Sequence, residues 1–226
     1  FVNSTLAENK EISDTDKQHR ISLVTFASSA NTRHELTTVT ADSAANINGT
    51  INGLNANGST GADYAMNNTK TVLESAREDA QKVVIFFTDG EPNHGNGFSG
   101  TVANAAIGTA KDLKAADTKM YSIGMFGNAN PSDTSNNFNA YMHGMSSNYP
   151  AASSYTNLGD RATNADGTET AYYKKASDSE ELSKVFDEIF KEISKIEASS
   201  PFEEGTGTDG ENMAAVTFHD ELGDYM

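Results

Sequence analysis

Cysteine is absent from this chain of 226 residues, which excludes disulfide bonds, thiolate metal sites and cysteine nucleophiles. Small secreted animal domains commonly carry disulfides, so the absence argues mildly against that class. The sequence also lacks any run that approaches the roughly 20 apolar residues of a membrane-spanning helix. A chain of this length buries about 70% of its extended surface, so one α/β domain folds without disulfides or a structural metal.

Positive charge is scarce as well. The sequence holds 16 Lys and Arg against 32 Asp and Glu, a formal net charge of −16. No basic cluster interrupts this acidity, so nucleic acid is a disfavoured partner, and an anionic membrane surface is disfavoured for the same reason. Cations and basic protein surfaces suit such a chain better. The alternative is that the acidity serves only solubility.

Apolar residues alternate along the chain between strand-type runs and helical spacing. The predicted strands are residues 21–26, 33–39, 83–87, 119–127 and 172–176, with 33–39 as an antiparallel edge beside 21–26. The predicted helices are residues 1–9, 43–54, 61–78, 101–117, 138–145 and a long helix opened by the capping-box signature Ser177–Glu180. This order predicts a Rossmann-like open, mostly parallel sheet with helices on both faces.

The last part of the chain differs in composition. Residues 199–212, SSPFEEGTGTDGEN, are predicted to be a linker. Residues 213–226 are interpreted as the first strand of a following, β-rich domain. The chain starts at Phe1 and stops within that strand, so we interpret it as a piece of a longer protein. The absence of a signal peptide then carries no information about location.

The stretch VVIFFTDGEPNHGNGFSG, residues 83–100, ends an apolar strand on the carboxylate of Asp89. In parallel α/β sheets, function lies in the loops at the carboxyl ends of the strands. Three interpretations of Asp89 stay open. The Asp-Gly pair is an ordinary turn former, the carboxylate acts in catalysis, or it holds a hard cation such as Mg²⁺, which prefers oxygen ligands.

A second loop, within LNANGSTGADYAM at residues 54–66, delivers Ser59 and Thr60 to the start of a predicted helix. Hydroxyls at that position usually act as N-caps, and this alternative explains the local pattern by itself. The loop also lies one strand-and-helix unit before Asp89.

Four motifs, ISLVTFASSA, GSTGADYAMNNTKTVL, KVVIFFTDGEP and KMYSIGMFG, follow one another in this order. Their order and spacing resemble the von Willebrand factor A domain over residues 1–198. The resemblance implies a metal-ion-dependent adhesion site on top of the sheet. In the family its oxygens come from an Asp-x-Ser-x-Ser loop after the first strand, a Thr and a further Asp. The last two correspond to Thr60 and Asp89.

The chain departs from the family pattern on its N-terminal side. No Asp-x-Ser-x-Ser precedes Ile21, so the family's first strand, central in the sheet, is missing from this chain. The gap lies between the strands at 21–26 and 83–87, and truncation of the sequence explains it. Mg²⁺ takes about six oxygens in octahedral geometry, whereas Thr60 and Asp89 supply two. We therefore expect Mg²⁺, or Mn²⁺ or Ca²⁺, to bind this fragment weakly or not at all.

Other candidates are fewer. Ser59, Glu91, Asn93 and His94 are predicted to form a rim that meets a partner. The remaining histidines lack zinc-site spacing, and these are His19, His34, His143 and His219. No Gly-x-Ser-x-Gly occurs, and the glycine-spotted segment at 124–137 lacks the lysine of a phosphate loop. A hydrolase that uses Asp89 has no partner residue.

The resemblance implies a non-enzymatic binding module, in which a carboxylate of a protein ligand completes the metal shell. The missing cysteines, the polar loops and the final VTFHDELGDYM are most similar to surface or pilus-tip adhesins of Gram-positive bacteria. That implies an extracellular location on a cell wall or pilus, flanking stalk domains, host extracellular matrix as ligand and no membrane insertion. The alternative is an intracellular subunit of the same family that mediates assembly with a partner ATPase.

Overall fold

The computed structural model describes residues 1–198, with side chains up to residue 194. Residues 1–190 form one compact unit. The predicted linker at 199–212 and the predicted strand at 213–226 lie outside the described residues. The elements are α1 (Val2–Glu11), β1 (Arg20–Phe26), β2 (Ala30–Thr38), α2 (Ala41–Asn52), α3 (Ala62–Leu73), β3 (Lys82–Thr88), α4 (Gly100–Ala115), β4 (Thr118–Gly124), α5 (Asn137–Met145), β5 (Tyr173–Lys175) and α6 (Ser179–Ala198).

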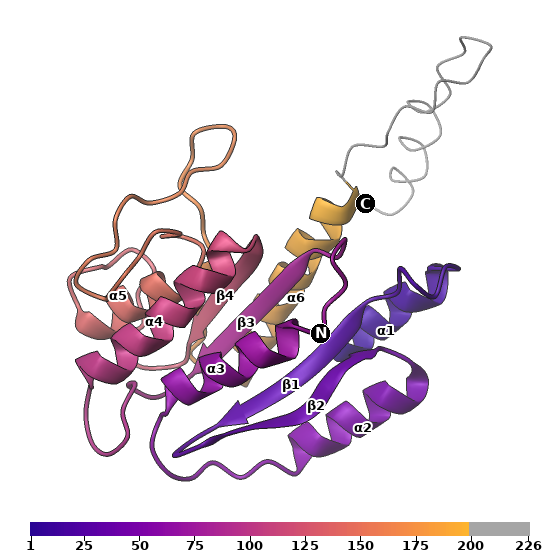
Figure 1. Ribbon diagram of the computed structural model, residues 1–226, viewed down its shortest axis with the longest axis horizontal. Helices are drawn as coiled ribbons and strands as arrows, with labels where there is room; N and C mark the ends of the chain where they lie inside the picture. The colour runs from indigo at the N-terminus through magenta and orange to yellow at the C-terminus, as the bar shows by residue number, and fades with distance from the viewer. Residues whose placement is uncertain (199–226) are drawn as a thin grey trace. The chain divides into compact units, whose positions relative to one another are not determined.

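The strands form two separate ladders. β1 pairs with β2 antiparallel, as the sequence predicts for an edge pair. β3, β4 and β5 form a parallel sheet with β4 in the middle. Figure 1 shows α3 and α4 in front of the parallel strands and α6 behind them. The predicted fold class, an α/β sheet covered by helices on both faces, is therefore confirmed.

A hydrophobic core cluster joins the parallel strands to α3, α4 and α5. β4 is the most buried strand because it has a ladder partner on each side and helices over its faces. Representative buried members of the cluster are Met66, Phe86, Ile107, Met120 and Tyr141. This packing fixes the carboxyl ends of β3 and β4, from which the candidate site projects.

Two strands predicted to be buried are only half-buried. All seven residues of β1 and the first four of β3 are part-exposed, and Phe87 is 38% exposed. The reason is pairing: within residues 1–198, β1 has only β2 as a ladder partner and β3 has only β4. The two strands still meet through Phe26 and Phe86, whose rings stack at 5.3 Å. No described strand fills the family's central position, as the sequence predicts.

The sequence misplaces two helix ends. α3 ends at Leu73 and not at residue 78, because the next three backbone N–H groups bond in tight turns to the carbonyls three residues back. α6 is capped one residue later than predicted. Asp178 Oδ1 accepts from the backbone N–H of Glu181 at 2.9 Å, and the Glu181 carboxylate accepts from that of Ser177 at 2.8 Å. These bonds lower the pKa of both carboxyls below their ordinary values.

Candidate functional site

The loop before α3 is fastened to the end of β1. Ser59 donates its backbone N–H to Ser28 Oγ at 3.1 Å, and Gly61 donates its own to the carbonyl of Ala27 at 2.7 Å. Gly58 has a φ of +90°, and a Cβ there would lie 2.7 Å from Ser28 Oγ. Only glycine allows this turn and this close approach. The glycines of the NGSTG stretch thus fix where the two hydroxyls of the loop lie.

Neither hydroxyl of this loop caps α3. The N-cap residue is Gly61, and no side chain accepts a hydrogen bond there, so the N-cap alternative is wrong. Ser59 Oγ contacts Ser28 Oγ at 3.1 Å instead. The Thr60 hydroxyl makes no hydrogen bond to any residue in the part of the chain that the structure describes. It is an available oxygen.

The carboxylate of Asp89, like the hydroxyl of Thr60, makes no hydrogen bond within residues 1–198. The turn after β3 is closed by the buried Thr88, whose Oγ1 accepts from the backbone N–H of Gly90 at 3.2 Å. The Asp89 side chain is exposed and forms no hydrogen bond or ion pair with residues 1–198. The turn therefore does not account for a carboxylate at this position.

The two loops meet. A Cβ added at Gly90 would lie 2.6 Å from Thr60 Oγ1, so the hydroxyl of Thr60 touches the residue that directly follows Asp89. The backbone N–H of Asn93 donates to the carbonyl of Thr60 at 2.9 Å and forms an isolated antiparallel bridge. One hydroxyl and one carboxylate, from segments about thirty residues apart in the sequence, thus belong to adjoining positions above β3.

Of the four rim residues, Ser59, Asn93 and His94 make side-chain hydrogen bonds within the fold, and only Glu91 makes none to residues 1–198. The side-chain amide of Asn93 donates to the carbonyl of Glu91 at 2.6 Å and its oxygen accepts from the N–H of Gly95 at 3.1 Å. His94 Nε2 lies 2.8 Å from Asp63 Oδ1. These contacts hold the 91–97 loop onto the first turn of α3.

Aromatic stacking adds to this attachment. The imidazole of His94 lies flat on the ring of Tyr64, with centroids 4.4 Å apart and planes 7° apart. Tyr64 is itself 41% exposed. Sequence reasoning missed both Asp63 and Tyr64, although their place in the first turn of α3 was readable from the helix start.

Asp89 and Glu91 face an open hollow of about 240 Å³. Its other wall comes from the segment after β4, through Phe126 and Asn128 among others, and from the first turn of α5, through Phe138. The rings of Phe126 and Phe138 stack at 3.7 Å. The sequence offered no pattern for this wall, because residues 127–170 have weak periodicity.

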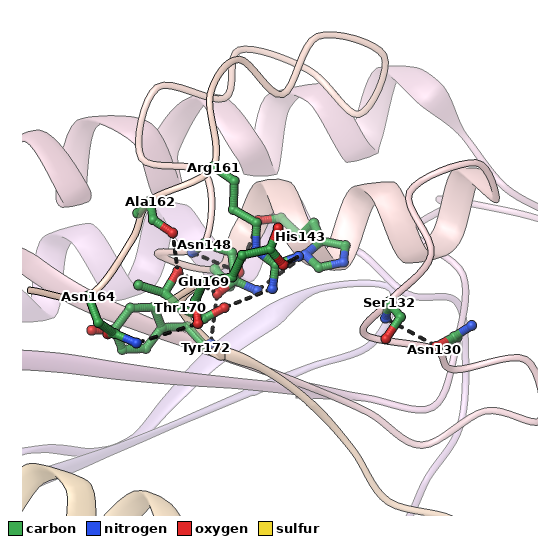
Figure 2. Close-up of polar contacts among 11 residues, drawn as sticks. Asn130, Ser132, His143, Asn148, Arg161, Ala162, Asn164, Glu169, Thr170 and Tyr172 are labelled. Carbon is green, nitrogen blue, oxygen red and sulfur yellow. Dashed lines mark hydrogen bonds and ion pairs between the residues drawn. The ribbon is translucent and has the colours of Figure 1, made fainter. Parts of the chain in front are cut away.

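The side chain of Asn148 holds the long connection that leads from α5 to β5 (Figure 2). Its amide approaches His143 Nδ1 at 3.2 Å, and its oxygen accepts from the Thr170 hydroxyl at 3.1 Å and the Tyr172 N–H at 2.8 Å. The ring of His143 is fully buried. Burial, followed by the charge of Arg161, lowers the pKa of His143 to about 4.

Lys114 of α4 supports the start of the same connection. Its ammonium donates to the carbonyls of Gly144, Ser146 and Tyr149 at 2.6, 3.1 and 2.9 Å. It thereby satisfies carbonyls at the C-terminal end of α5. Burial, with Lys111 as the second cause, lowers the pKa of Lys114 to about 7, whereas the three carbonyls favour the charged form.

The donor set of the candidate site contains only oxygen. Among residues 1–198, no group of three or more His, Asp or Glu side chains is placed to hold a metal ion. The Thr60 hydroxyl and the Asp89 carboxylate suit a hard cation such as Mg²⁺ or Ca²⁺ rather than a site built on histidine nitrogen. Both are oxygen donors of the type that such an ion prefers, and together they would supply only part of its coordination shell.

The family can now be stated. The chain belongs to the von Willebrand factor type A domain family, whose model matches residues 1–188. No curated protein matches the chain at a significant level of similarity. None of the helices within residues 1–198 is long and apolar enough to span a membrane.

Solved structures of similar fold come from bacteria and from the mussel byssus. The pilus adhesin SpaC of Lactobacillus rhamnosus GG superposes with a TM-score of 0.59 at 15% identity, over 86% of this chain and 27% of that one. The PilB minor pilin of Streptococcus sanguinis gives 0.58 at 19% identity, over 88% and 54%. Mussel proximal thread matrix protein 1 with a zinc-occupied MIDAS motif gives 0.53 at 20% identity, over 85% and 39%. At these identities the likeness shows the fold alone, and the chain spans about half or less of each structure.

Proposed function

We propose that this domain is a non-enzymatic adhesion module that captures a protein ligand through a divalent cation held by Thr60 and Asp89. The observation that supports the proposal is that the Thr60 hydroxyl lies against Gly90, the residue directly after Asp89, and that neither the hydroxyl nor the carboxylate makes a hydrogen bond within residues 1–198. Asp89 is exposed and Thr60 is part-exposed, so both side chains are accessible to a ligand. The adjoining hollow leaves room for a partner side chain.

A bound Mg²⁺, Mn²⁺ or Ca²⁺ would leave a coordination position that a Glu or Asp of the ligand can complete. Thr60 and Asp89 would supply oxygens, the latter directly or through water. An Asp-x-Ser-x-Ser loop at the missing central strand would supply the rest in the longer protein. With two protein donors and solvent, this fragment binds the cation weakly.

Two solved structures of similar fold support the proposed location. SpaC is a pilus adhesin and PilB a minor pilin, which supports a place on a bacterial surface or pilus beside stalk domains of the same chain. An extracellular matrix protein of the host is the proposed ligand class. The rim residues that remain outward-facing, Glu91 foremost, would meet it.

Mn²⁺ binding to the purified chain tests the metal part of this proposal. Titration followed by electron paramagnetic resonance should show that Asp89→Ala and Thr60→Ala each weaken binding by about tenfold. Asp79→Ala is the matched control, because Asp79 is also exposed but precedes β3, at the opposite end of that strand. Mn²⁺ affinities that are equal in all three variants would refute the site.

Bead capture tests the adhesion part. Beads that carry the chain should bind a collagen or fibronectin coating in Mg²⁺ and lose that binding in EDTA and in Asp89→Ala. Capture that persists under both conditions would show that the ligand is held elsewhere.

A further inference from the structure

A second hollow, of about 510 Å³, lies on the other side of the start of α5. Segments 134–140 and 149–159 line it, and they include Thr134, Tyr149, Tyr155 and Asn157. None of its lining residues is charged, although 21% of the whole chain is charged. A charged ligand would find no charged side chain in this wall, although the Arg161 guanidinium lies over the ring of Tyr149, 5.9 Å from its centroid.

Polar side chains at this hollow fall into two groups: the hydroxyls of Ser135 and Thr156 are hydrogen-bonded to Asp133 and Ser154, whereas the others are unbonded. The side chains of Thr134, Asn137 and Asn157 and the hydroxyls of Tyr149 and Tyr155 make no hydrogen bond to residues 1–198.

Neighbouring asparagines behave differently. Asn136 caps α5, Asn130 closes a turn on Ser132 (Figure 2), and Asn139 bonds the carbonyl of Asn128 at 3.0 Å. The asparagines that support the fold are therefore distinct from those that face the hollow.

The two tyrosine rings are held in place from behind. Tyr155 packs edge-on against Phe98 at 5.0 Å, and its backbone N–H donates to Asn104 Oδ1 at 3.2 Å. Tyr149 packs edge-on against the buried His143 at 5.4 Å. The rings are thus pre-organised while their hydroxyls stay available. Pre-organised groups lower the entropy cost of binding a ligand.

We propose that this hollow binds a neutral saccharide. A sugar ring presents hydroxyls that both donate and accept, and amide and hydroxyl side chains match them. Its C–H face packs on an aromatic ring such as Tyr155. A purely apolar ligand would bury the amides and hydroxyls without partners, which is costly. The site uses neither Thr60 nor Asp89, so it goes beyond the adhesion site and is independent of metal.

Saturation-transfer difference NMR tests the proposal with the intact chain and a panel of neutral disaccharides: lactose, maltose, cellobiose and chitobiose. Sialyllactose and a sulfated disaccharide are the charged counterparts. We expect transfer to the ring protons of at least one neutral sugar, with weaker transfer to the charged ones. Addition of EDTA and the Asp89→Ala substitution should leave the transfer unchanged.

Two conservative variants locate the binding. Asn157→Ala and Tyr155→Phe remove polar groups that make no hydrogen bond to residues 1–198, and each should weaken binding of the sugar by about fivefold. Asn46→Ala, at an exposed position on α2, is the matched control and should bind like the unaltered chain. Absence of transfer from every neutral sugar, equal affinity in all three variants, or preference for a charged sugar would each overturn the proposal.

Discussion

Acidification should destabilise the domain through His143. This ring is fully buried between Tyr149 and Tyr173, whose rings lie 5.4 and 5.0 Å away. Burial is the largest cause of its lowered pKa; the charge of Arg161 lowers it further, and that of Asp133 raises it. Protonation below the ordinary pKa of histidine would place a charge in this apolar position.

The magnitude follows from linkage. Folding lowers the pKa of His143 from 6.5 to about 4. Between these pH values His143 binds a proton in the unfolded chain but not in the folded chain. The contribution of the neutral His143 ring to the free energy of unfolding is therefore fully present above the pKa of the unfolded chain. It is lost as the pH falls toward the pKa of the folded chain. Between about pH 7.5 and about pH 5 the loss amounts to about 2 kcal/mol, and it reaches about 3 kcal/mol when both forms are protonated.

Urea denaturation at these two pH values, with intrinsic tyrosine fluorescence, measures the effect. Because the many carboxylates also titrate, the comparison is with His143→Asn, whose amide oxygen can still accept from Asn148. The variant loses the packing of the ring at every pH. Between about pH 7.5 and about pH 5, its free energy of unfolding should fall by about 2 kcal/mol less than that of the unaltered chain. If both proteins lose equal stability, His143 is not the group responsible and the reasoning is refuted.

Three further predictions concern single contacts. Lys114→Met should cost about 2–3 kcal/mol in urea denaturation, because buried carbonyls at the end of α5 lose their donor, whereas exposed Lys111→Met should cost little. Asp178→Ala should cost about 1 kcal/mol by the same assay, since α6 loses its N-cap. Gly90→Ala should weaken Mn²⁺ binding by displacing the Thr60 hydroxyl, while Gly95→Ala, which meets open space, should not. Equal effects within either matched pair, or an unaffected Asp178→Ala, would contradict these assignments.

Secondary structure was largely readable from the sequence, because apolar spacing differs between strands and helices. Every predicted element within residues 1–198 is present. A helix end is mispredicted where two neighbouring residues suit the same role equally well. Ser177 and Asp178 are adjacent and both suit an N-cap, and only the folded backbone selects Asp178. The half-burial of β1 and β3 depends on which strands are present to pair with them, which no local pattern encodes.

The candidate site was predictable only in part. The resemblance assigned Thr60 and Asp89, but their residue types fitted an N-cap and a turn equally well. In the structure Gly61 is the N-cap of α3 and Thr88 supplies the side-chain bond of the turn after β3, so neither role uses the Thr60 hydroxyl or the Asp89 carboxylate. The walls of both hollows escaped prediction. Asn136 and Asn137 are adjacent and of the same type, and only the folded helix start makes Asn136 the N-cap of α5 and leaves the Asn137 side chain without a hydrogen bond to residues 1–198.

The most direct test of the central claim is paramagnetic broadening by Mn²⁺ in NMR spectra of the isotope-labelled chain. The account predicts that trace Mn²⁺ broadens the amide signals of Thr60, Asp89 and Gly90 before all others, and that Asp89→Ala abolishes this order. Broadening that starts at other acidic surfaces, or that is unchanged in the variant, would show that the hydroxyl and the carboxylate do not share a cation.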